Sequence, residues 1–451
     1  MNVLIIGSGG REHALALAIA QDPTVGKVHV APGNPGTANF ACNHPLNILD
    51  GAAVAKLART LGVDLVVIGP EAPLVAGVAD AVRAAGIACF GPSEEAARLE
   101  GSKAFAKRIM DEAAVPTAAC QVCDNPRQAA SALDIFGPPY VVKNDGLAAG
   151  KGVLVTTDRA AALAHATACG RVVIEEYLDG PEVSLFVITD GKTALPLLAA
   201  QDFKRVGEHD TGANTGGMGA YCPLPWAPAN LSEQVMTQVA LPTIRRMAAR
   251  NTPFIGLLYC GLALTSYGLK VVEFNARFGD PETEVILPLL ASPLGQLLYA
   301  AATGTLDEVD ELRWRNGACV GVVLAANGYP GELTTKNGHL KLPRDTSTAH
   351  MIHASTGWNA AELATSDSPI PCDIAKTCSA SQSTTELVAT GGRVLVSVGT
   401  GTDIAAARQA AYKLADAVDF PSGFYRQDIA APEQLTAIAQ LLTDSAYSDN
   451  D

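Results

Sequence analysis

The polar residues of the segment 270–278 have types and a spacing that could do chemistry. Polar and apolar side chains alternate there, as in a strand with two different faces, and this places Glu273, Asn275 and Arg277 on one face. The opposite face, which includes Val272, would join the core. Two oxygen ligands two residues apart can share a magnesium ion, and an adjacent arginine can stabilise a phosphoryl group in transfer. An ordinary solvated strand face is the alternative interpretation.

A glycine-rich segment with a lysine near each end covers residues 143–152. Its spacing is one residue short of a Walker loop, and Gly152 replaces the hydroxyl residue that would bind magnesium. Glycines let backbone amides approach a triphosphate closely, and Lys143 and Lys151 would add positive charge. We therefore predict a phosphate-covering loop that includes Gly150, with a flexible linker as the alternative.

A second glycine-rich loop covers residues 210–219 and contains small hydroxyl side chains and the acid Asp210. Such a loop could contact a compact polar ligand closely. Long glycine-rich loops in compact domains tend to be functional, although a plain loop is the alternative. The candidate substrate contacts in this loop are Asn214, Thr215, Gly216 and Gly217.

Acidic residues lie at the end of a strand-like run over residues 172–176. Backbone groups at 176–178 could bind the edge of an adenine, and Glu182 could hold ribose hydroxyls. A surface acidic hairpin would have a similar sequence, so both interpretations stay open. The candidate nucleotide contacts are Glu175, Glu176, Tyr177, Leu178 and Glu182.

A glycine turn at residues 7–10 stands between a short apolar strand and a helix. Its backbone N–H groups and the helix N-terminus could hold a phosphate. A dinucleotide site is disfavoured, because Glu12 occupies the position of the third glycine and the second strand has no acid at its end. Arg11 favours a phosphomonoester, and a tight turn without a ligand is the alternative. The candidate contacts are Gly9, Gly10 and Arg11.

Gly69 and Glu71 follow a third strand-like run, at the carboxyl edge where ligands of parallel sheets collect. A carboxylate at that edge could accept hydrogen bonds from ribose hydroxyls, or it could be a solvated loop acid. Both residues are therefore candidate substrate contacts.

Alternating strands and helices must position these residues. The apolar runs lie at residues 3–6, 28–31 and 63–69, and the helical stretches at 12–21 and 52–61. This order predicts a parallel sheet covered by helices. Ser102 can cap a helix over 103–112, so the first domain should end near residue 102.

Later strand-like runs predict two further units. Runs at 140–143, 172–176 and 182–189 flank the first glycine-rich loop and predict a small β-rich flap. Runs from about residue 325 onward predict a third unit. We therefore expect an α/β protein with a doubly wound N-terminal domain at 1–102, a central domain at 103–324 with a flap at about 123–190, a C-terminal α+β domain at 325–428, and a helix with an acidic tail at 429–451.

The composition excludes several function classes. The chain has 451 residues and a formal net charge of −14, which disfavours nucleic-acid binding, because that binding depends on clustered lysines and arginines. The apolar run after Met1 ends at Gly7 and is too short for a signal peptide or a membrane span. Ten scattered cysteines are typical of a reducing compartment. We expect a cytoplasmic protein without nucleic-acid or membrane partners.

Four sequence strings carry a close resemblance to a known family. They are GSGGREHA at 7–14, PGNPGTA at 32–38, GPEAPLVAG at 69–77 and RFGDPETE at 277–284. From residue 1 to about 428, the chain resembles the phosphoribosylamine–glycine ligase family of the ATP-grasp superfamily. The resemblance implies an N-terminal phosphoribosylamine-binding domain, an ATP-grasp clamp with a mobile flap, and a C-terminal domain that closes the site.

The resemblance also implies roles for individual residues. Lys103 and Lys143 would contact the nucleotide phosphates, residues 175–178 would line the adenine pocket, and Glu182 would hold the ribose. Glu273 and Asn275 would bind the metal ion, either Mg²⁺ or Mn²⁺. Asn34, in the second string, is a further candidate substrate contact. The candidate catalytic residues are Arg277, Asp210 and Lys204.

The family's reaction converts ATP, glycine and 5-phosphoribosylamine to ADP, phosphate and glycinamide ribonucleotide, the second step of purine biosynthesis. The resemblance implies a glycyl phosphate that the amine captures. We expect a monomer or a weak homodimer. The alternatives are another ATP-grasp ligase or a carboxylase acting on a ribonucleotide, an NAD-dependent oxidoreductase, and a non-catalytic nucleotide-binding module. The chain departs from the family pattern at Asn144, where alanine is usual, and at Ala213, where proline is usual.

Overall fold

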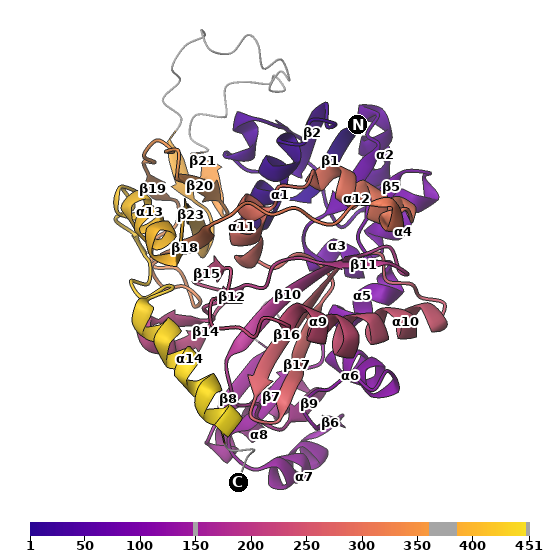
Figure 1. Cartoon of the computed structure of the whole chain (residues 1–451), viewed down its shortest axis with the longest axis vertical. Helices are drawn as coiled ribbons and strands as arrows, with labels where there is room; N and C mark the ends of the chain where they lie inside the picture. The colour runs from indigo at the N-terminus through magenta and orange to yellow at the C-terminus, as the bar shows by residue number, and fades with distance from the viewer. Residues whose placement is uncertain (148–151, 360–385, 448–451) are drawn as a thin grey trace.

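The computed structural model describes residues 1–147, 152–359 and 386–447. The N-terminal unit contains a five-stranded parallel sheet in the order β3-β2-β1-β4-β5 (Figure 1). Its strands are β1 (Asn2–Gly7), β2 (Lys27–Pro32), β3 (Cys42–Asn43), β4 (Leu65–Ile68) and β5 (Ala88–Phe90). The helices that follow them are α1 (Gly10–Ala20), α2 (Gly51–Leu61), α3 (Glu71–Val75), α4 (Val78–Ala84) and α5 (Glu94–Gly101).

Helices cover both faces of this sheet. Val3 and Ile5 of β1 pack in one cluster with Leu15 of α1, whereas Leu4 and Ile6 pack in another cluster with residues of α2 and α4. A strand that is buried on both faces has a continuous apolar sequence, and this is the pattern of residues 3–6. The predicted doubly wound N-terminal sheet is confirmed.

The lower part of the molecule in Figure 1 is a small antiparallel sheet in the order β6-β9-β7-β8. Its strands are β6 (Cys120–Cys123), β7 (Tyr140–Asn144), β8 (Val153–Thr156) and β9 (Val172–Glu175), and it packs against α7 (Pro126–Phe136) and α8 (Arg159–Cys169). Helix α6 (Lys103–Glu112) leads into it and is capped by Ser102, whose hydroxyl accepts from the Phe105 N–H.

The flap differs from the range 123–190 that the sequence suggested. Strand β10 (Glu182–Thr189) pairs with β16 instead of the flap strands. Its last seven residues are buried, because it lies inside a second antiparallel sheet in the order β11-β10-β16-β17. The remaining strands of this sheet are β11 (Ala194–Pro196), β16 (Gly256–Thr265) and β17 (Gly268–Asn275).

Strand β17 contains a bulge that changes the predicted faces. Gly261 of β16 pairs with Glu273, but its neighbour Leu262 pairs with Val271, so Val272 is an extra residue. The prediction that Val272 lies on the buried face is wrong: Val271 is fully buried, and Val272 is only partly buried. From Glu273 to Asn275 the pairing is regular, so these two side chains do share a face.

The third unit is built on a sheet in the order β12-β15-β18-β23-β20, with β24 also paired to β18. Its strands are β12 (Gln201–Asp202), β15 (Gly219–Cys222), β18 (Ala318–Ala326), β20 (Ala349–His353), β23 (Arg393–Gly401) and β24 (Gly423–Phe424). The sheet therefore recruits two strands from the central segment, and β18 begins before the predicted boundary at residue 325. Helix α13 (Ile404–Asp416) packs on β18 and β23.

Shorter elements complete the chain. The hairpin of β13 (Arg205–Gly207) and β14 (Thr211–Asn214) follows β12, and β19 (Gly338–Leu340), β21 (Thr356–Trp358) and β22 (Leu387–Ala389) form a separate small sheet. The remaining helices are α9 (Leu231–Val235), α10 (Leu241–Ala249), α11 (Glu282–Ile286), α12 (Leu294–Thr303) and α14 (Pro432–Tyr447).

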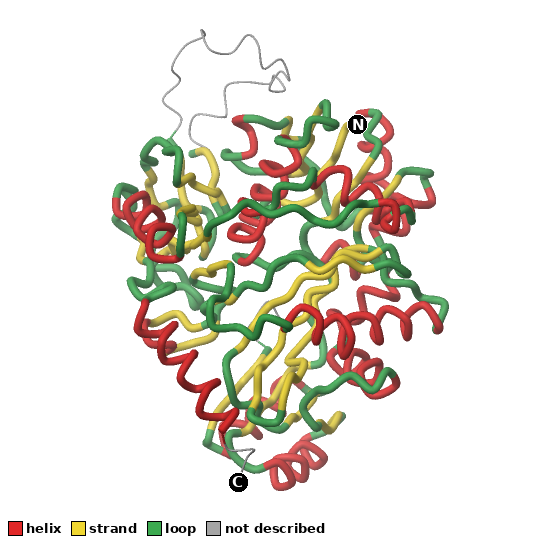
Figure 2. The backbone as a smooth tube through the Cα atoms, in the orientation of Figure 1, coloured by secondary structure: helices red, strands yellow, loops and turns green. Residues whose placement is uncertain are grey.

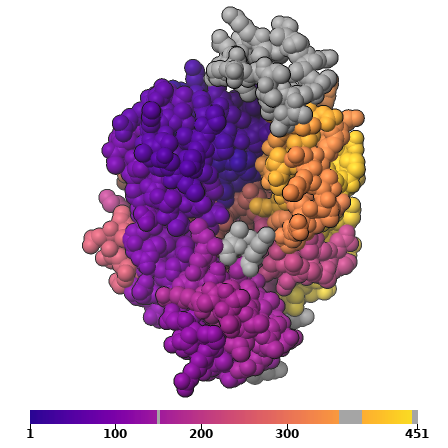
Figure 3. Space-filling view, turned by 180° about the vertical axis from the view of Figure 1, so that it is seen from behind, coloured from indigo at the N-terminus to yellow at the C-terminus, as the bar shows by residue number. Residues whose placement is uncertain are grey.

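The N-terminal unit, the flap and the C-terminal unit lie around the sheet of β10, β11, β16 and β17. In Figure 2 the helices lie mainly on the outside of the yellow strands. Figure 3 shows the indigo N-terminal unit beside the orange C-terminal unit, with the magenta flap below both. Within the described residues, no helix is long and apolar enough to cross a membrane.

Candidate active site

Glu273 is the acidic centre of the candidate site. Gly261 lies opposite it on β16, where a Cβ atom would stand only 3.3 Å from the Glu273 Cγ. Burial alone would raise the pKa of Glu273, but nearby positive charges lower the pKa below its ordinary value. These charges belong to Lys204, Lys103, Lys143 and Arg277. The side chains come from four different segments, and the fold brings them to one carboxylate.

Lys143 of β7 and Lys107 of α6 hold Glu175 between them. The Lys143 Nζ lies 2.8 Å from Glu175 Oε2, and the Lys107 Nζ lies 3.2 Å from Glu175 Oε1. Lys143 also donates to the Val272 carbonyl at 2.9 Å, which the bulge in β17 turns toward it. Burial lowers the pKa of Lys107, whereas Glu175 and Glu273 together raise that of Lys143 against the effect of burial.

Lys107 was missing from the sequence-based site. It lies four residues after Lys103 on α6, and residues at that spacing share a helix face. The spacing could have marked it as a candidate, but a lysine on a helix is more often solvated. In the structure Lys107 is only 7% exposed.

Lys204 follows β12 and faces two acids. Its Nζ is salt-bridged to Glu182 and lies 3.9 Å from Asp202 Oδ1. Burial opposes the charge of Lys204, but Asp202 and Glu182 raise its pKa well above the ordinary value. Burial, aided by Glu282 and Glu182, raises the pKa of Asp202 to about 7. The predicted ribose contact Glu182 is therefore paired with Lys204.

Arg277 is held by two carboxylates. Its Nε lies 3.3 Å from Glu71 Oε2, and its Nη2 lies 3.1 Å from Glu100 Oε1. Glu100, which the sequence did not single out, also accepts the Ala276 N–H at 2.7 Å. Burial tends to raise the pKa of Glu71, but Arg277 and Arg11 lower it, so this predicted ribose contact carries a negative charge.

Glu12 fills the glycine turn that follows β1. A Cβ on Gly69 would lie 2.1 Å from Glu12 Oε1, and a Cβ on Gly7 would lie 2.5 Å from the Glu12 side chain. The Glu12 carboxylate accepts the Gly9 N–H at 2.7 Å and lies 2.5 Å from the Arg11 Nε. The glycines therefore make room for Glu12, which stands where a dinucleotide fingerprint has its third glycine.

The predicted phosphate contacts at the start of α1 face acids. The Arg11 N–H points to Asp280 Oδ2 at 3.4 Å, and a Cβ on Gly10 would lie 2.7 Å from Glu284 Oε1. Within the described residues, neither carboxylate oxygen of Glu284 has a hydrogen-bond partner, and burial raises its pKa well above the ordinary value. Glu12 and Asp280 hold Gly9 and Arg11, so a phosphate bound at this turn would have to replace these acidic neighbours.

Asn34 ties the N-terminal unit to the C-terminal unit. Its amide group donates to the Ser8 carbonyl at 2.8 Å and to the His353 carbonyl at 3.0 Å. Its Oδ1 accepts the N–H groups of Gly36 and Thr37. The side chain is 6% exposed and fully used in these contacts, so the structure places this predicted substrate contact in a structural turn.

The second glycine-rich loop is anchored by side chains that the sequence did not identify. Arg393, at the start of β23, donates to the Gly216 carbonyl and lies 3.1 Å from Asp280 Oδ1. The Gly216 N–H donates to the Tyr329 hydroxyl at 2.9 Å. Thr215 donates both its N–H and its hydroxyl to the Lys204 carbonyl, and the Gly217 N–H donates to the Thr215 hydroxyl. A glycine pair before Arg393 was the available sequence signal.

Three predicted residues lie at the margin of the site. Asn214 pairs with Arg205 in the β13–β14 hairpin, and the 61% exposed Asp210 side chain forms an ion pair with Arg426. Gly152 is buried, and its carbonyl accepts the Asn144 N–H at 2.8 Å. The predicted contacts Gly150 and Lys151 lie outside the described residues.

The predicted adenine segment follows β9. The Glu176 carboxylate accepts from the Lys270 Nζ at 2.8 Å and from the Ala119 N–H at 3.0 Å. Tyr177 is 52% exposed, and Leu178 is partly buried. The segment is therefore fixed at Glu176 and open at Tyr177.

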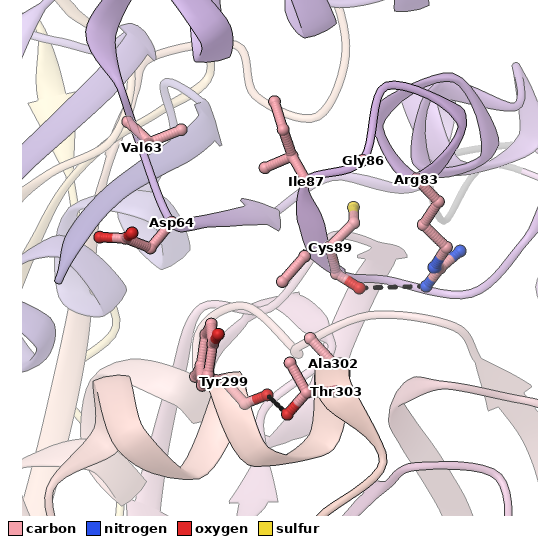
Figure 4. Close-up of a pocket in the computed structure, with 10 residues that line it drawn as sticks. Val63, Asp64, Arg83, Gly86, Ile87, Cys89, Tyr299, Ala302 and Thr303 are labelled. Atoms are coloured by element: carbon pink, nitrogen blue, oxygen red, sulfur yellow. Dashed lines mark hydrogen bonds between the residues drawn. The ribbon is translucent and has the colours of Figure 1, made fainter.

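A surface cavity of about 490 Å³ lies apart from all of these residues, between β5 and α12. Figure 4 shows the Arg83 side chain at its edge, where the guanidinium donates to the Cys89 carbonyl at 3.0 Å. Burial raises the pKa of the Cys89 thiol to about 12. None of the predicted site residues lines this cavity.

Comparisons with known proteins give the family. Models of the phosphoribosylglycinamide synthetase N domain, ATP-grasp (A) domain and C domain match residues 1–100, 101–283 and 319–432. The phosphoribosylamine–glycine ligase of Streptomyces coelicolor is 53% identical over 435 residues, which cover 96% of this chain and 99% of that protein. The Mycobacterium tuberculosis enzyme of the same name is 52% identical over 438 residues, which cover 95% and 97%.

The chain belongs to the phosphoribosylglycinamide synthetase family. A solved member, the phosphoribosylamine–glycine ligase of Thermotoga maritima, has a TM-score of 0.78 and 32% identity, and the match covers 95% of this chain and 100% of that one. As a member of this family, the chain is a ligase with an ATP-grasp domain.

A more distant likeness shows the fold alone. The biotin carboxylase domain of Hydrogenobacter thermophilus 2-oxoglutarate carboxylase, solved with MgADP and bicarbonate, has a TM-score of 0.66 at 13% identity. The likeness covers 100% of this chain and 95% of that one. The ligase identity rests on the nearer relatives.

Proposed function

We propose that this chain ligates glycine to 5-phosphoribosylamine through glycyl phosphate, giving N1-(5-phosphoribosyl)glycinamide, ADP and phosphate. This is the reaction expected of the family, a step of purine biosynthesis. The observation that carries the proposal is the position of Glu273 among four cations, Lys204, Lys103, Lys143 and Arg277. Such a cluster suits phosphoryl transfer, in which catalysis consists largely of positioning and charge neutralisation.

ATP would bind between the flap and the β10–β17 sheet. Lys143 and Lys103 would contact its phosphates, and residues 175–178 would line the adenine. Glu182 would hold the ribose after exchanging its present partner Lys204 for the sugar hydroxyls. Gly150, Lys151 and Gly152 would cover the phosphates. The Lys107–Glu175–Lys143 arrangement supports this assignment, since it fixes a lysine next to the predicted adenine segment.

Glu273 and Asn275 fit a divalent cation. Both lie on one face of β17, and the lowered pKa of Glu273 keeps its carboxylate ionised at neutral pH. A carboxylate and an amide oxygen are hard ligands of the kind that Mg²⁺ or Mn²⁺ takes, and Mg²⁺ completes its shell with waters and substrate phosphates. When bound, the ion would neutralise charge on the terminal phosphates. Within the described residues, no cluster of three or more His, Cys, Asp or Glu side chains offers another metal site.

The chain's own cations would carry the phosphoryl transfer. The glycine carboxylate would attack the γ-phosphate, and the bond from that phosphorus to the β–γ bridging oxygen would break to release ADP. Lys204 and Arg277 would stabilise the charge that spreads over the transferred group. The amine of phosphoribosylamine would then attack the acyl carbon, expel phosphate and lose a proton.

Phosphoribosylamine would bind where the three units meet, near Gly9, Gly10, Arg11, Gly69 and Glu71. The glycine-rich loop with Asn214, Thr215, Gly216 and Gly217 would close over the substrates. Asp280 and Glu284 suit the amine end of the ligand, while Arg11 and Arg393 would have to exchange carboxylate partners for the phosphate. We propose a cytoplasmic enzyme that is a monomer or a weak homodimer, with Asn34 supporting the site.

The decisive experiment measures ADP formation by the purified chain with ATP, Mg²⁺ and glycine, with and without freshly prepared phosphoribosylamine. We expect glycine-dependent ADP release that phosphoribosylamine stimulates. A parallel assay replaces glycine by bicarbonate. ADP release with bicarbonate and none with glycine would replace the proposal by a carboxylase, and no ADP release with either would leave a nucleotide-binding module.

A further inference from the structure

A deeply buried charged side chain near the second glycine-rich loop comes from the C-terminal segment. Arg426 is 2% exposed, and it binds Asp428 through two parallel hydrogen bonds of 2.7 Å. A planar guanidinium paired in this way with a carboxylate is fixed in orientation. Asp428 also accepts the Gln434 amide at 2.7 Å, which joins the pair to the start of α14.

The third nitrogen of Arg426 reaches the β13–β14 hairpin. Its Nη1 donates to the Arg205 carbonyl at 2.9 Å and to Asp210 Oδ1 at 2.9 Å. The guanidinium also lies 5.2 Å from the centre of the Phe203 ring. Arg426 thus touches the residues on both sides of Lys204, and the Lys204 carbonyl is held in turn by Thr215.

The turn of the hairpin has a backbone that needs outside support. His209 and Asp210 both have left-handed backbone angles, with φ of 55° and 53°. Two consecutive non-glycine residues in this region are strained, and such strain persists where surrounding contacts determine it. The turn is exposed, and the C-terminal segment holds it through the Arg426–Asp210 pair, the 2.8 Å hydrogen bond from the His209 N–H to Asp428, and the 3.2 Å hydrogen bond from the Gln427 N–H to Glu208.

We propose that Arg426 and Asp428 form a clasp that positions the β13–β14 hairpin, and through it Lys204, for the ligation. The clasp acts from the C-terminal unit on a hairpin of the central segment, and Gln434 joins it to α14. Asp210 is then an anchor for Arg426 and does not touch the reacting atoms. The inference rests on the proposed role of Lys204.

The first test compares two substitutions at the exposed anchor. Asp210→Ala removes the acceptor for Arg426, whereas Asp210→Asn keeps an oxygen in its place. We expect Asp210→Ala to lower kcat about tenfold with little change in the KM for ATP, because a loosened positioning element reduces turnover. Asp210→Asn should recover kcat to within about twofold of wild type. Equal losses in both variants would identify an essential charge at Asp210 and overturn the anchor role.

The second test measures the mobility of the hairpin as the amide hydrogen-exchange rates of residues 203–215. Arg426→Lys cannot reproduce the paired contacts to Asp428 and the third contact to Asp210 at once. We expect faster exchange across these residues and a kcat reduced about tenfold or more. Arg408→Lys is the matched control, because Arg408 binds the Gln427 and Ile429 carbonyls of the same segment without reaching the hairpin.

The two readouts separate the clasp from the proposed function. Unchanged exchange and unchanged kcat in Arg426→Lys would overturn the clasp even if the wild type is an active ligase. A wild type without glycine-dependent ADP release would overturn the proposed function, and the exchange of residues 203–215 would still decide whether Arg426 holds the hairpin. Faster exchange with normal kcat would show that the hairpin does not position Lys204 and would also overturn the inference.

Discussion

At the scale of single residues, the site is a balance of buried charges. Glu273 faces four cations, and three of these cations have further acidic neighbours: Glu175 beside Lys143, Glu182 beside Lys204, and Glu71 beside Arg277. Burying an unpaired charge costs far more than burying a pair. These ion pairs therefore hold the charged side chains in place. A bound substrate would replace some of the protein partners with its own charged groups.

The role of Glu273 can be tested by Glu273→Gln, which keeps the volume and removes the charge. We expect turnover to fall by on the order of a thousandfold, the scale of losing one strong electrostatic contribution to the transition state. Metal-dependent ADP formation and thermal stability are measured on the same preparations, together with Asn275→Asp, which keeps an oxygen ligand. A folded Glu273→Gln variant with normal turnover and metal dependence would falsify the metal assignment.

Lys107 is expected to orient Glu175 for nucleotide binding. In Lys107→Met, Glu175 keeps Lys143 as an ion-pair partner, and the Thr117 hydroxyl and the buried Ala118 carbonyl lose a donor. We expect the KM for ATP to rise about tenfold, which corresponds to roughly 1.4 kcal/mol. The exposed neighbour Arg108, changed to methionine, is the control on the same helix. If the KM for ATP stays near the wild-type value in both variants, Lys107 does not contribute to nucleotide binding and has only a structural role.

At the scale of elements, two local irregularities shape the site. The bulge at Val272 turns a carbonyl toward Lys143 while keeping Glu273 and Asn275 on one face. The glycine turn after β1 and the residue after β4 leave a space that Glu12 fills. Each irregularity has a partner from another element. The bulge presents a carbonyl to Lys143 of β7, and the glycine turn accommodates the Glu12 side chain of α1.

The packing of Glu12 predicts a coupling between two positions. Gly69→Ala places a methyl group against Glu12, and overpacking of this kind costs about 1–3 kcal/mol. In a Glu12→Ala background the same change should cost much less, because the opposing side chain is gone. The free energies of unfolding of wild type, both single variants and the double variant measure this coupling. Additive effects would contradict the packing of Glu12 against Gly69.

At the scale of the whole molecule, the N-terminal and C-terminal units meet through neutral polar groups. Besides the Asn34 contact, the His353 N–H donates to the His13 Nδ1 at 2.9 Å. Burial, with the nearby His353 and His350, lowers the pKa of His13 to about 3, and burial lowers that of His353 to about 4. Both rings therefore stay neutral in the folded protein.

These histidines predict a loss of stability in acid. Their folded-state pKa values lie below the ordinary 6.5, so unfolding takes up protons below that pH, and the stability present above pH 6.5 falls as pH decreases toward 4. At pH 5.5 each histidine should lower the free energy of unfolding by about 1.4 kcal/mol relative to its value well above pH 6.5. Unfolding free energies of wild type and His13→Gln at pH 7.5 and 5.5 test this. Parallel pH slopes in the two proteins would show that His13 contributes nothing to the acid loss.

The sequence by itself determined where several strands and helices lie and which side chains of β17 share a face. The continuous apolar run at 3–6 predicted a strand buried on both faces, and Ser102 predicted the start of α6, because these signals depend on neighbouring residues only. The alternation over 273–275 predicted the shared face of Glu273 and Asn275 for the same reason. The family strings supplied the reaction class.

The tertiary structure alone decided which partners each side chain has. Glu100 and Arg426 have no local pattern that marks them. Lys107 and Arg393 have weak local signals, the spacing from Lys103 and the preceding glycine pair, but these signals do not reveal partners that lie far away in the sequence. The bulge at Val272 and the position of β10 in the second sheet depend on pairing with β16. Asn34 and Arg11 belong to motifs whose spacing suggests ligand contacts, and the structure adds the protein contacts that these side chains make. Spacing along the chain fixes periodicity, whereas burial and charge pairing are set by segments that meet only after folding.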